Sequence, residues 1–211
     1  MNLLLIAIFA AVGIVSFKGF NDPAFFDKYK FNIARIQNGE KYRLLTSGFL
    51  HADIAHLFFN LLTLYFFAPV VINYFGDGIF ILIYMVSLLA GNLFTLKIHE
   101  SQPYYSAIGA SGAIMGVLYA AILINPTMSL YLFFIPIPIP AYIVGVGYLL
   151  YSIYGMKKQN DLIGHTAHLG GAVAGLFVTT LFDYQLIMEN VMITLLLLIP
   201  VILLIVMLKK Q

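Results

Sequence analysis

Three groups of polar residues interrupt a sequence that is otherwise strongly apolar, and each supplies residue types that nucleophilic catalysis needs. The first group is Gly109-Ala110-Ser111-Gly112, at the start of a predicted helix. A serine there lies beside unpaired backbone N–H groups and the positive end of the helix dipole, which together stabilise an oxyanion. The same residues are also typical of a small-residue packing face with a capping serine, so this group alone does not establish catalysis.

The second group contains His165 and His168, at the start of another predicted helix. A serine is a poor nucleophile until a neighbouring base takes its proton, and imidazole is suited to that task near neutral pH. We therefore take Ser111 as the candidate nucleophile and His168 as its candidate base. His165 lies one turn earlier, and we expect it to be a polar residue at the membrane interface.

Glycine spacing predicts that the helices of these two groups touch. Gly112 and Gly116 are four residues apart in one helix, and Gly171 and Gly175 are four apart in the other. Each pair forms a smooth groove of the kind that brings membrane helices into close contact. Small residues beside the serine, such as Gly109, let another backbone approach it closely.

The third group is His51, His56 and Asn60, around the start of an earlier predicted helix. His56 and Asn60 are four residues apart and therefore share one helix face. Neutral histidine and asparagine donors aimed at one point would complete an oxyanion hole begun by the Ser111 backbone N–H. The alternative is that these side chains make hydrogen bonds between helices.

The composition indicates that the three groups lie inside a membrane. The 211 residues are 62% hydrophobic and only 9% charged, whereas soluble domains have about 25% charged residues. We therefore expect an all-α, polytopic membrane bundle that forms a single domain over residues 1–211. The absence of cysteine excludes disulfides and thiolate metal sites, and a net charge of +2 is too small to indicate a nucleic-acid partner.

Hydropathy predicts seven membrane spans, at about residues 2–17, 54–74, 79–96, 109–124, 141–154, 163–182 and 191–208. A glycine-rich turn at 76–78 separates the second span from the third. The polar connection 18–50 suits a segment at the membrane interface, and the proline-rich stretch 135–140 suits an apolar loop. Even-numbered spans run in the same direction, so the three polar groups are expected at one membrane face.

The order and spacing of these motifs resemble those of the rhomboid family of intramembrane serine proteases, across about residues 42–183. The matching motifs are His51-x4-His56-x3-Asn60, then Gly109-Ala110-Ser111-Gly112 with Gly116, then His165-x2-His168-Leu169-Gly170-Gly171 with Gly175. The span at 191–208 is similar to the additional helix of bacterial-type, six-plus-one members. The resemblance therefore implies a six-helix core plus a C-terminal seventh transmembrane helix.

The resemblance also implies a Ser111–His168 dyad that works without a third acidic residue, a cofactor or a metal. His56, Asn60 and the Ser111 backbone would form the oxyanion hole, and His51 would have a structural role beside it. The implied partners are the lipid bilayer and single-span transmembrane proteins. Such substrates would be cut near their outer end, after local unwinding of the helix.

Location and access are further expectations from the resemblance. Substrates would enter between the second and fifth spans, with the loop at about 157–163 as a cap over the site. We expect the inner membrane of a bacterium, with the active site opening outside the cytoplasm. The charge pattern opposes this orientation, because all eleven Lys and Arg residues fall on the catalytic side and the positive-inside rule would place that side in the cytoplasm.

Two alternatives use the same residues. The first is a transporter or channel in which His51, His56, His165 and His168 form a proton relay or a divalent metal site. The second is a catalytically inactive rhomboid-like protein that only binds transmembrane helices. The presence of both Ser111 and His168 favours the protease over either alternative.

Overall fold

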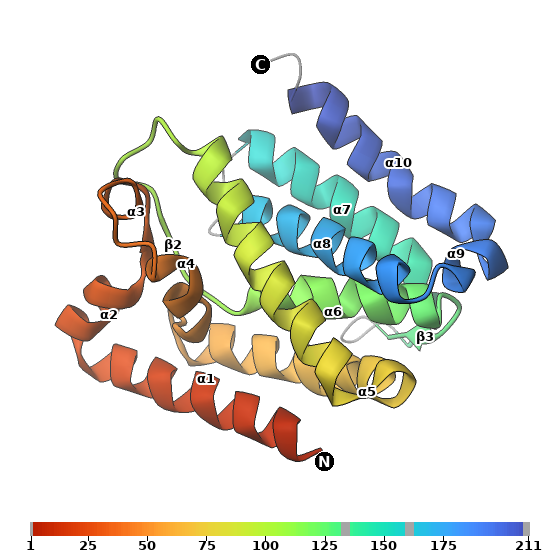
Figure 1. Cartoon of the computed structure of the whole chain (residues 1–211), viewed down its shortest axis with the longest axis horizontal. Helices are drawn as coiled ribbons and strands as arrows, with labels where there is room; N and C mark the ends of the chain where they lie inside the picture. Colours follow the sequence, from red (N-terminus) through yellow and green to blue (C-terminus); the bar gives the residue numbers. More distant parts are fainter. Residues whose placement is uncertain (1, 132–135, 159–162, 209–211) are drawn as a thin grey trace.

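The computed structural model describes residues 2–131, 136–158 and 163–208, and its main elements are long helices (Figure 1). The bundle consists of α1 (Leu3–Asn21), α5 (Ile54–Ile98), α6 (Ser111–Ile124), α7 (Ala141–Lys158), α8 (His165–Phe182) and α10 (Val191–Leu208). Each of the seven predicted spans corresponds to one of these helices or to one half of α5, and three of the spans were predicted to begin one or two residues before the helix does. Helices α1 and α7 each extend four residues beyond their predicted ends.

Helix α5 changes direction at Gly76, inside the predicted turn. The backbone there has φ 80° and ψ 174°, a conformation that glycine adopts readily and other residues avoid. The two halves of α5 therefore meet at an angle and return the chain toward its starting side (Figure 1). As a result, the start of α5 and the end of α5 lie at the same end of the bundle.

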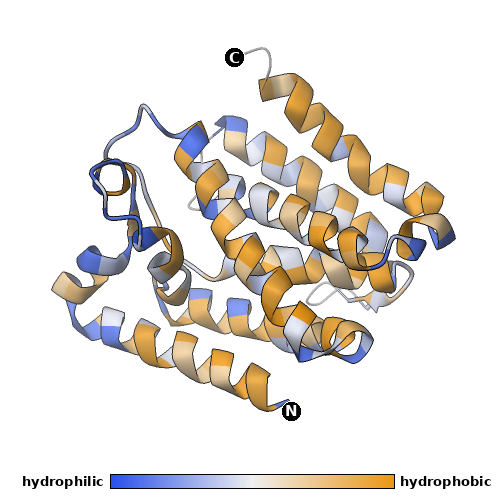
Figure 2. Cartoon of the chain, viewed as in Figure 1, coloured by the Kyte–Doolittle hydropathy of each residue, from blue (hydrophilic) through white to orange (hydrophobic). Residues whose placement is uncertain are grey.

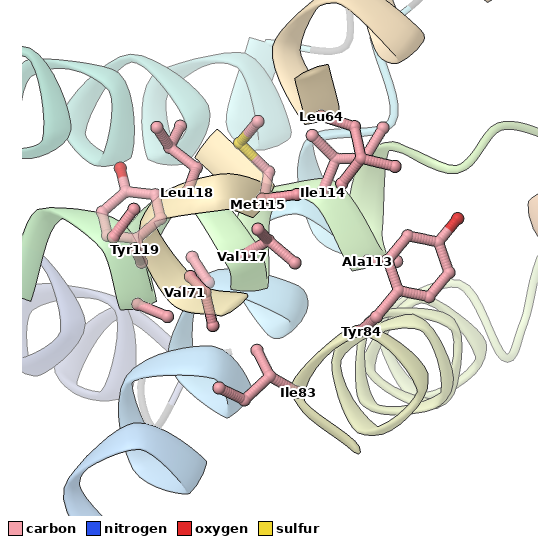
Figure 3. Packing of buried hydrophobic residues seen from close by; sticks show 14 of the residues in the cluster. Leu64, Val71, Ile83, Tyr84, Ala113, Ile114, Met115, Val117, Leu118 and Tyr119 are labelled. Carbon is pink, nitrogen blue, oxygen red and sulfur yellow. The ribbon is translucent and has the colours of Figure 1, made fainter. Parts of the chain in front are cut away.

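Helix α6 is the central element of the bundle. Twelve of its 14 residues are buried, from Gly112 to Leu123. Figure 3 shows α6 side chains such as Val117 and Tyr119 packed among Leu64, Val71 and Ile83 of α5. At about 1.5 Å per residue α6 is roughly 21 Å long, shorter than a hydrocarbon core of about 30 Å. Helix α6 is therefore too short to reach both surfaces of the hydrocarbon core.

The predicted contact between the glycines of α6 and α8 is present. A Cβ atom added to Gly171 would collide with the carbonyl oxygen of Gly112, and one added to Gly175 would collide with that of Gly116. Both obstructing atoms belong to the backbone, which cannot rotate away as a side chain can. The two helices therefore approach so closely that only glycine fits at these positions.

The connection between α1 and α5 is folded and lies at one end of the bundle. It contains α2 (Pro23–Tyr29), β1 (Phe31–Asn32), α3 (Ile33–Gln37), α4 (Arg43–Thr46) and the 3₁₀ helix η1 (Ser47–Phe49). Arg43 is 1% exposed, and it donates hydrogen bonds to the carbonyls of Asp27 and Lys30 and to the Glu40 carboxylate. Strand β1 pairs antiparallel with β2 (Ser106–Ala107). The predicted interfacial segment is thus anchored to the strand that leads into α6.

Shorter elements connect the remaining helices. Strand β3 (Ser129–Leu130) pairs antiparallel with β4 (Ile139–Pro140), at the end of the predicted proline-rich loop. Helix α9 (Gln185–Glu189), which the sequence did not predict, precedes α10. Most of the predicted cap at 157–163 lies outside the described residues, as do Lys209 and Lys210.

Polar residues collect at the two ends of the bundle and differ in charge between them. Figure 2 shows hydrophilic residues gathered around α2, α3 and the adjacent ends of α5 and α7. The basic residues that the structure describes all belong to this end: Lys18, Lys28, Lys30, Arg35, Lys41, Arg43, Lys97, Lys157 and Lys158. The opposite end carries the acidic residues Asp77, Asp183 and Glu189. Three described helices, α1, α5 and α10, are long and apolar enough to cross a membrane.

The glycine contact between α6 and α8 can be tested by substitution. Gly171→Val should destabilise the protein by about 3 kcal/mol, because the new side chain meets a backbone carbonyl rather than an adaptable side chain. The measurement is the thermal unfolding midpoint of the purified protein in detergent. Gly147→Val in α7 is the control, since nothing lies within 4 Å of its added Cβ. A Gly171→Val protein with the same thermal unfolding midpoint as the wild type would contradict the packing described above.

Candidate active site

Ser111 and His168 face each other between α6 and α8. Ser111 is the first residue of α6, and His168 lies one turn into α8. The Ser111 Oγ and His168 Nε2 atoms are 2.6 Å apart, which is a short hydrogen bond. His168 is 8% exposed. The structure therefore brings together the two residues that the sequence paired, inside the apolar bundle.

The second nitrogen of His168 contacts Tyr148 of α7, a residue that the sequence did not single out. The Tyr148 hydroxyl and His168 Nδ1 are 2.6 Å apart. If Ser111 donates its proton to Nε2, then Nδ1 carries the imidazole proton and donates it to the Tyr148 oxygen. The sequence offers no signal that separates Tyr148 from Tyr151 and Tyr154 in the same helix, because the choice depends on which face of α7 meets α8.

The start of α6 presents backbone N–H groups beside Ser111 that have no partner within the helix. The first backbone hydrogen bond of α6 runs from the Ile114 N–H to the Ala110 carbonyl oxygen, over 3.0 Å. The N–H groups of Ser111 and Gly112 precede it and have no carbonyl within the helix to bind. Gly109 forms the turn before them with φ 117°, and its own N–H donates to Ser47 O. Donors are thus available where an oxyanion attached to Ser111 would form.

His56 of α5 lies directly against this turn. A Cβ added to Gly109 would be 3.0 Å from His56 Nε2 and 3.7 Å from Ser111 Oγ. The Ala52 N–H points at His56 Nδ1 from 3.4 Å, so Nδ1 is the acceptor and Nε2 carries the proton. The Nε2–H donor of His56 therefore lies on the Ser111 side of the ring.

Asn60 lies one turn after His56 on the same face of α5, as the spacing predicted. Its side-chain Nδ2 is buried and has no hydrogen-bond partner among the described residues. A buried amide donor without a partner costs free energy, typically about 1–3 kcal/mol. Such a group is suited to a ligand that arrives only during a reaction.

His51 and His165 occupy supporting positions. The His51 ring packs edge-to-face on His56, with ring centroids 4.8 Å apart. His165, which we expected at the membrane interface, is 4% exposed and lies against Gly155 and the Tyr151 ring. Its depth in the membrane stays a prediction. His165 begins helix α8 at the end of the bundle, and neighbouring residues of α7 cover its side chain.

A cavity of about 370 Å³ adjoins the site on the side of the connecting loops. Its wall is more apolar than polar, but it includes the polar side chains of His56, His99, Tyr105, His165 and Thr166. A space of this size with several polar groups in its wall has room and hydrogen-bond partners for water. The cavity thus gives water a route to the neighbourhood of Ser111, although the surrounding bundle is apolar.

The chain is similar in sequence to known proteins. Residues 38–185 match the model of the family described as the Rhomboid domain. The chain is 29% identical over 181 residues to "RHOMBOID-like protein 12, mitochondrial" of Arabidopsis thaliana, a match that covers 78% of this chain and 54% of that protein. It is 37% identical over 145 residues to "Rhomboid protease GluP" of Bacillus subtilis, covering 67% of this chain and 26% of that protein.

A shorter match is 40% identical over 83 residues to "Putative rhomboid protease YdcA" of Bacillus subtilis, covering 39% of this chain and 40% of that protein. The chain spans about half, or less, of the length of these curated relatives.

The contact between Tyr148 and His168 leads to a test of nucleophile reactivity. Tyr148→Phe should slow covalent labelling of Ser111 by a fluorophosphonate about tenfold, because the imidazole loses the acceptor that orients it. The control is Tyr154→Phe, which removes a hydroxyl from a residue of the same helix that is 55% exposed. Equal labelling rates in the two variants would show that the Tyr148 hydroxyl does not orient His168.

Proposed function

Because the chain belongs to the rhomboid family, we propose that it is an intramembrane serine endopeptidase that cleaves transmembrane helices with a Ser111–His168 dyad. The observation that carries this proposal is the 2.6 Å contact between Ser111 Oγ and His168 Nε2. A serine and an imidazole in this geometry form the nucleophile and base of acyl-transfer chemistry. The protein is an integral, multi-pass membrane protein, so its substrates are reached within the bilayer.

The proposed reaction follows from the positions of the donors. Ser111 Oγ attacks the scissile carbonyl carbon while its proton passes to His168 Nε2. The oxyanion that forms accepts hydrogen bonds from the Ser111 N–H, His56 Nε2–H and Asn60 Nδ2–H groups. The imidazolium then gives its proton to the leaving nitrogen as the C–N bond breaks, which leaves an ester on Ser111.

Water completes the cycle. A water molecule from the adjoining cavity gives a proton to His168 as its oxygen attacks the ester carbon. The tetrahedral intermediate collapses, the new carboxylate product leaves, and the proton returns from His168 to Ser111 Oγ. No cofactor or metal takes part in this scheme, and Tyr148 holds the imidazole in the required orientation throughout.

The proposed substrates are single-span membrane proteins. A peptide bond within a helix is shielded, and its carbonyl already accepts a hydrogen bond. The substrate must therefore unwind locally before Ser111 reaches it, which favours helices with glycine or other helix-weakening residues near the cut. We propose entry between the first half of α5 and α7, the helices that carry His56 and Tyr148.

The two alternatives fit the site less well. A protein that only binds transmembrane helices has no need for a serine hydroxyl at hydrogen-bond distance from a base. A proton relay or metal site would use the four histidines as one group. They instead pair as His51 with His56 and His165 with His168, with ring centroids 4.8 Å and 6.5 Å apart. Among the described residues, no three histidine or acidic side chains converge as metal ligands would.

The proposed activity is tested with the purified full-length protein in detergent and a panel of single-span substrates. The wild type should cut at least one of them, and Ser111→Ala should abolish the cut while leaving the thermal midpoint nearly unchanged. Asn60→Ala should reduce kcat by roughly a hundredfold if its amide serves the oxyanion. Strong residual proteolysis in Ser111→Ala would overturn the assignment of the nucleophile. If the wild type cleaves none of the substrates, the result would favour the alternative of a catalytically inactive rhomboid-like protein.

For location we propose the inner membrane of a bacterium, with the catalytic end outside the cytoplasm. Support comes from two Bacillus subtilis proteins that are similar to this chain and are named as rhomboid proteases. Another similar protein is named as mitochondrial. The concentration of basic residues at the catalytic end opposes this orientation. The family resemblance and the distribution of basic residues thus predict opposite orientations, which an experiment can distinguish.

The chain has no cysteine, so single cysteines report the orientation directly. Tyr104 is 94% exposed at the catalytic end, and Gly78 lies at the opposite end with nothing within 4 Å of its added Cβ. An impermeant maleimide added to intact cells should label Tyr104→Cys and spare Gly78→Cys. The reverse pattern would place the catalytic end in the cytoplasm.

A further inference from the structure

Helix α1 contributes a polar residue to the site from outside the region that matches the family model. Ser16 is fully buried, and its Oγ lies 2.8 Å from His51 Nδ1 and 2.9 Å from Phe49 O. The other buried residues of α1 are Leu5, Ile8, Val12 and Gly19. Ser16 is thus the polar member of the stripe that α1 turns toward the bundle, whereas the matched family region begins at residue 38.

The hydrogen bonds around Ser16 are all satisfied by one placement of the Ser16 hydroxyl proton and the His51 ring proton. A serine hydroxyl has one proton, and Ser16 donates it to Phe49 O. Ser16 Oγ must then accept the proton that His51 carries on Nδ1. His51 Nε2 is left as an acceptor, and the Ala110 N–H points at it from 3.5 Å.

The opposite tautomer would conflict with the backbone. A proton on His51 Nε2 would face the N–H of Ala110, so two donors would meet without an acceptor between them. A doubly protonated ring would create the same conflict, and burial, together with the nearby His56, lowers the pKa of His51 to about 3. His51 is therefore neutral near physiological pH, with its proton on the Ser16 side.

This arrangement acts on the turn that presents Ser111. The N–H of Gly109 is held by Ser47 O at 3.0 Å, and the N–H of Ala110 is held by His51. Together these bonds fix the two peptide groups that precede Ser111. The N–H groups of Ser111 and Gly112 are then the first ones directed toward a substrate carbonyl.

We infer that Ser16 is a positioning residue, which fixes the tautomer of His51 and thereby the orientation of the Gly109–Ser111 backbone in the oxyanion hole. This inference rests on the proposed proteolytic function and extends the site to α1. Ser16 touches neither the substrate nor the dyad, and it acts only through His51 and Ala110.

Three variants separate this role from simple packing of α1. Ser16→Ala removes the hydroxyl, and Ser16→Thr retains it. Val12→Ala leaves the hydroxyl in place but opens a space on the same buried face of α1. All three are made in the full-length protein, and each is measured for its thermal midpoint, for kcat and KM of substrate cleavage, and for the imidazole ¹⁵N shifts of His51. The His51 signals are identified by their loss in His51→Asn.

Ser16→Ala should lower kcat about tenfold with KM within twofold, because a misplaced oxyanion donor weakens binding of the transition state more than binding of the substrate. Its His51 should lose the Nδ1–H form, and Ser16→Thr should restore both kcat and the tautomer. Val12→Ala should lower the thermal midpoint but leave kcat unchanged below it. The inference is overturned if Ser16→Ala retains wild-type kcat and tautomer, or if Val12→Ala lowers kcat equally.

Failure of the proposed function is distinguishable from failure of this inference. A wild-type protein that cuts no substrate and resists fluorophosphonate would remove the protease proposal. The ¹⁵N shifts would then decide the inference alone, since they require no activity. A His51 that keeps its Nδ1 proton in Ser16→Ala would overturn the inference, and loss of that proton would support it.

Discussion

The close backbone contact between α6 and α8 determines the geometry on which the site depends. In a membrane, lipid is as apolar as the helix surfaces, so helix association relies on tight van der Waals contact rather than on the hydrophobic effect. Glycines at Gly112, Gly116, Gly171 and Gly175 remove the side chains that would hold the two helices apart. Ser111 and His168 project from the same interface, so the separation of the helices fixes the distance between Oγ and Nε2.

The opposite wall of the site is held by hydrogen bonds rather than by close packing. His56 and Asn60 come from α5, and the Gly109 turn is tied to Ser47 and to His51. Buried polar groups in a membrane bundle are costly unless they find partners, and most of those in this wall do. Asn60 Nδ2 is an exception among the described residues, which fits a donor whose proposed partner is present only during catalysis.

The surroundings of the N-terminus of α6 fit the proposed hydrolysis in a membrane environment. Helix α6 is too short to span the hydrocarbon core, and the loops near its N-terminus leave a cavity whose wall includes polar side chains. The folded connection between α1 and α5 supports this cavity through the β1–β2 pair and the buried Arg43. Water can thus approach a serine that remains surrounded by apolar helices.

The sequence by itself determined the features that depend on local spacing. Hydropathy located the spans, Gly76 marked the break in α5, and the glycine pairs identified the α6–α8 contact, because each is encoded within one turn or one helix. The shared direction of alternate spans then brought Ser111 and His168 to one face. Tertiary structure alone decided that Tyr148 meets His168, that Ser16 meets His51, and that His165 is buried. These contacts depend on how each helix is rotated about its axis when it packs, and no pattern within a single segment specifies that rotation.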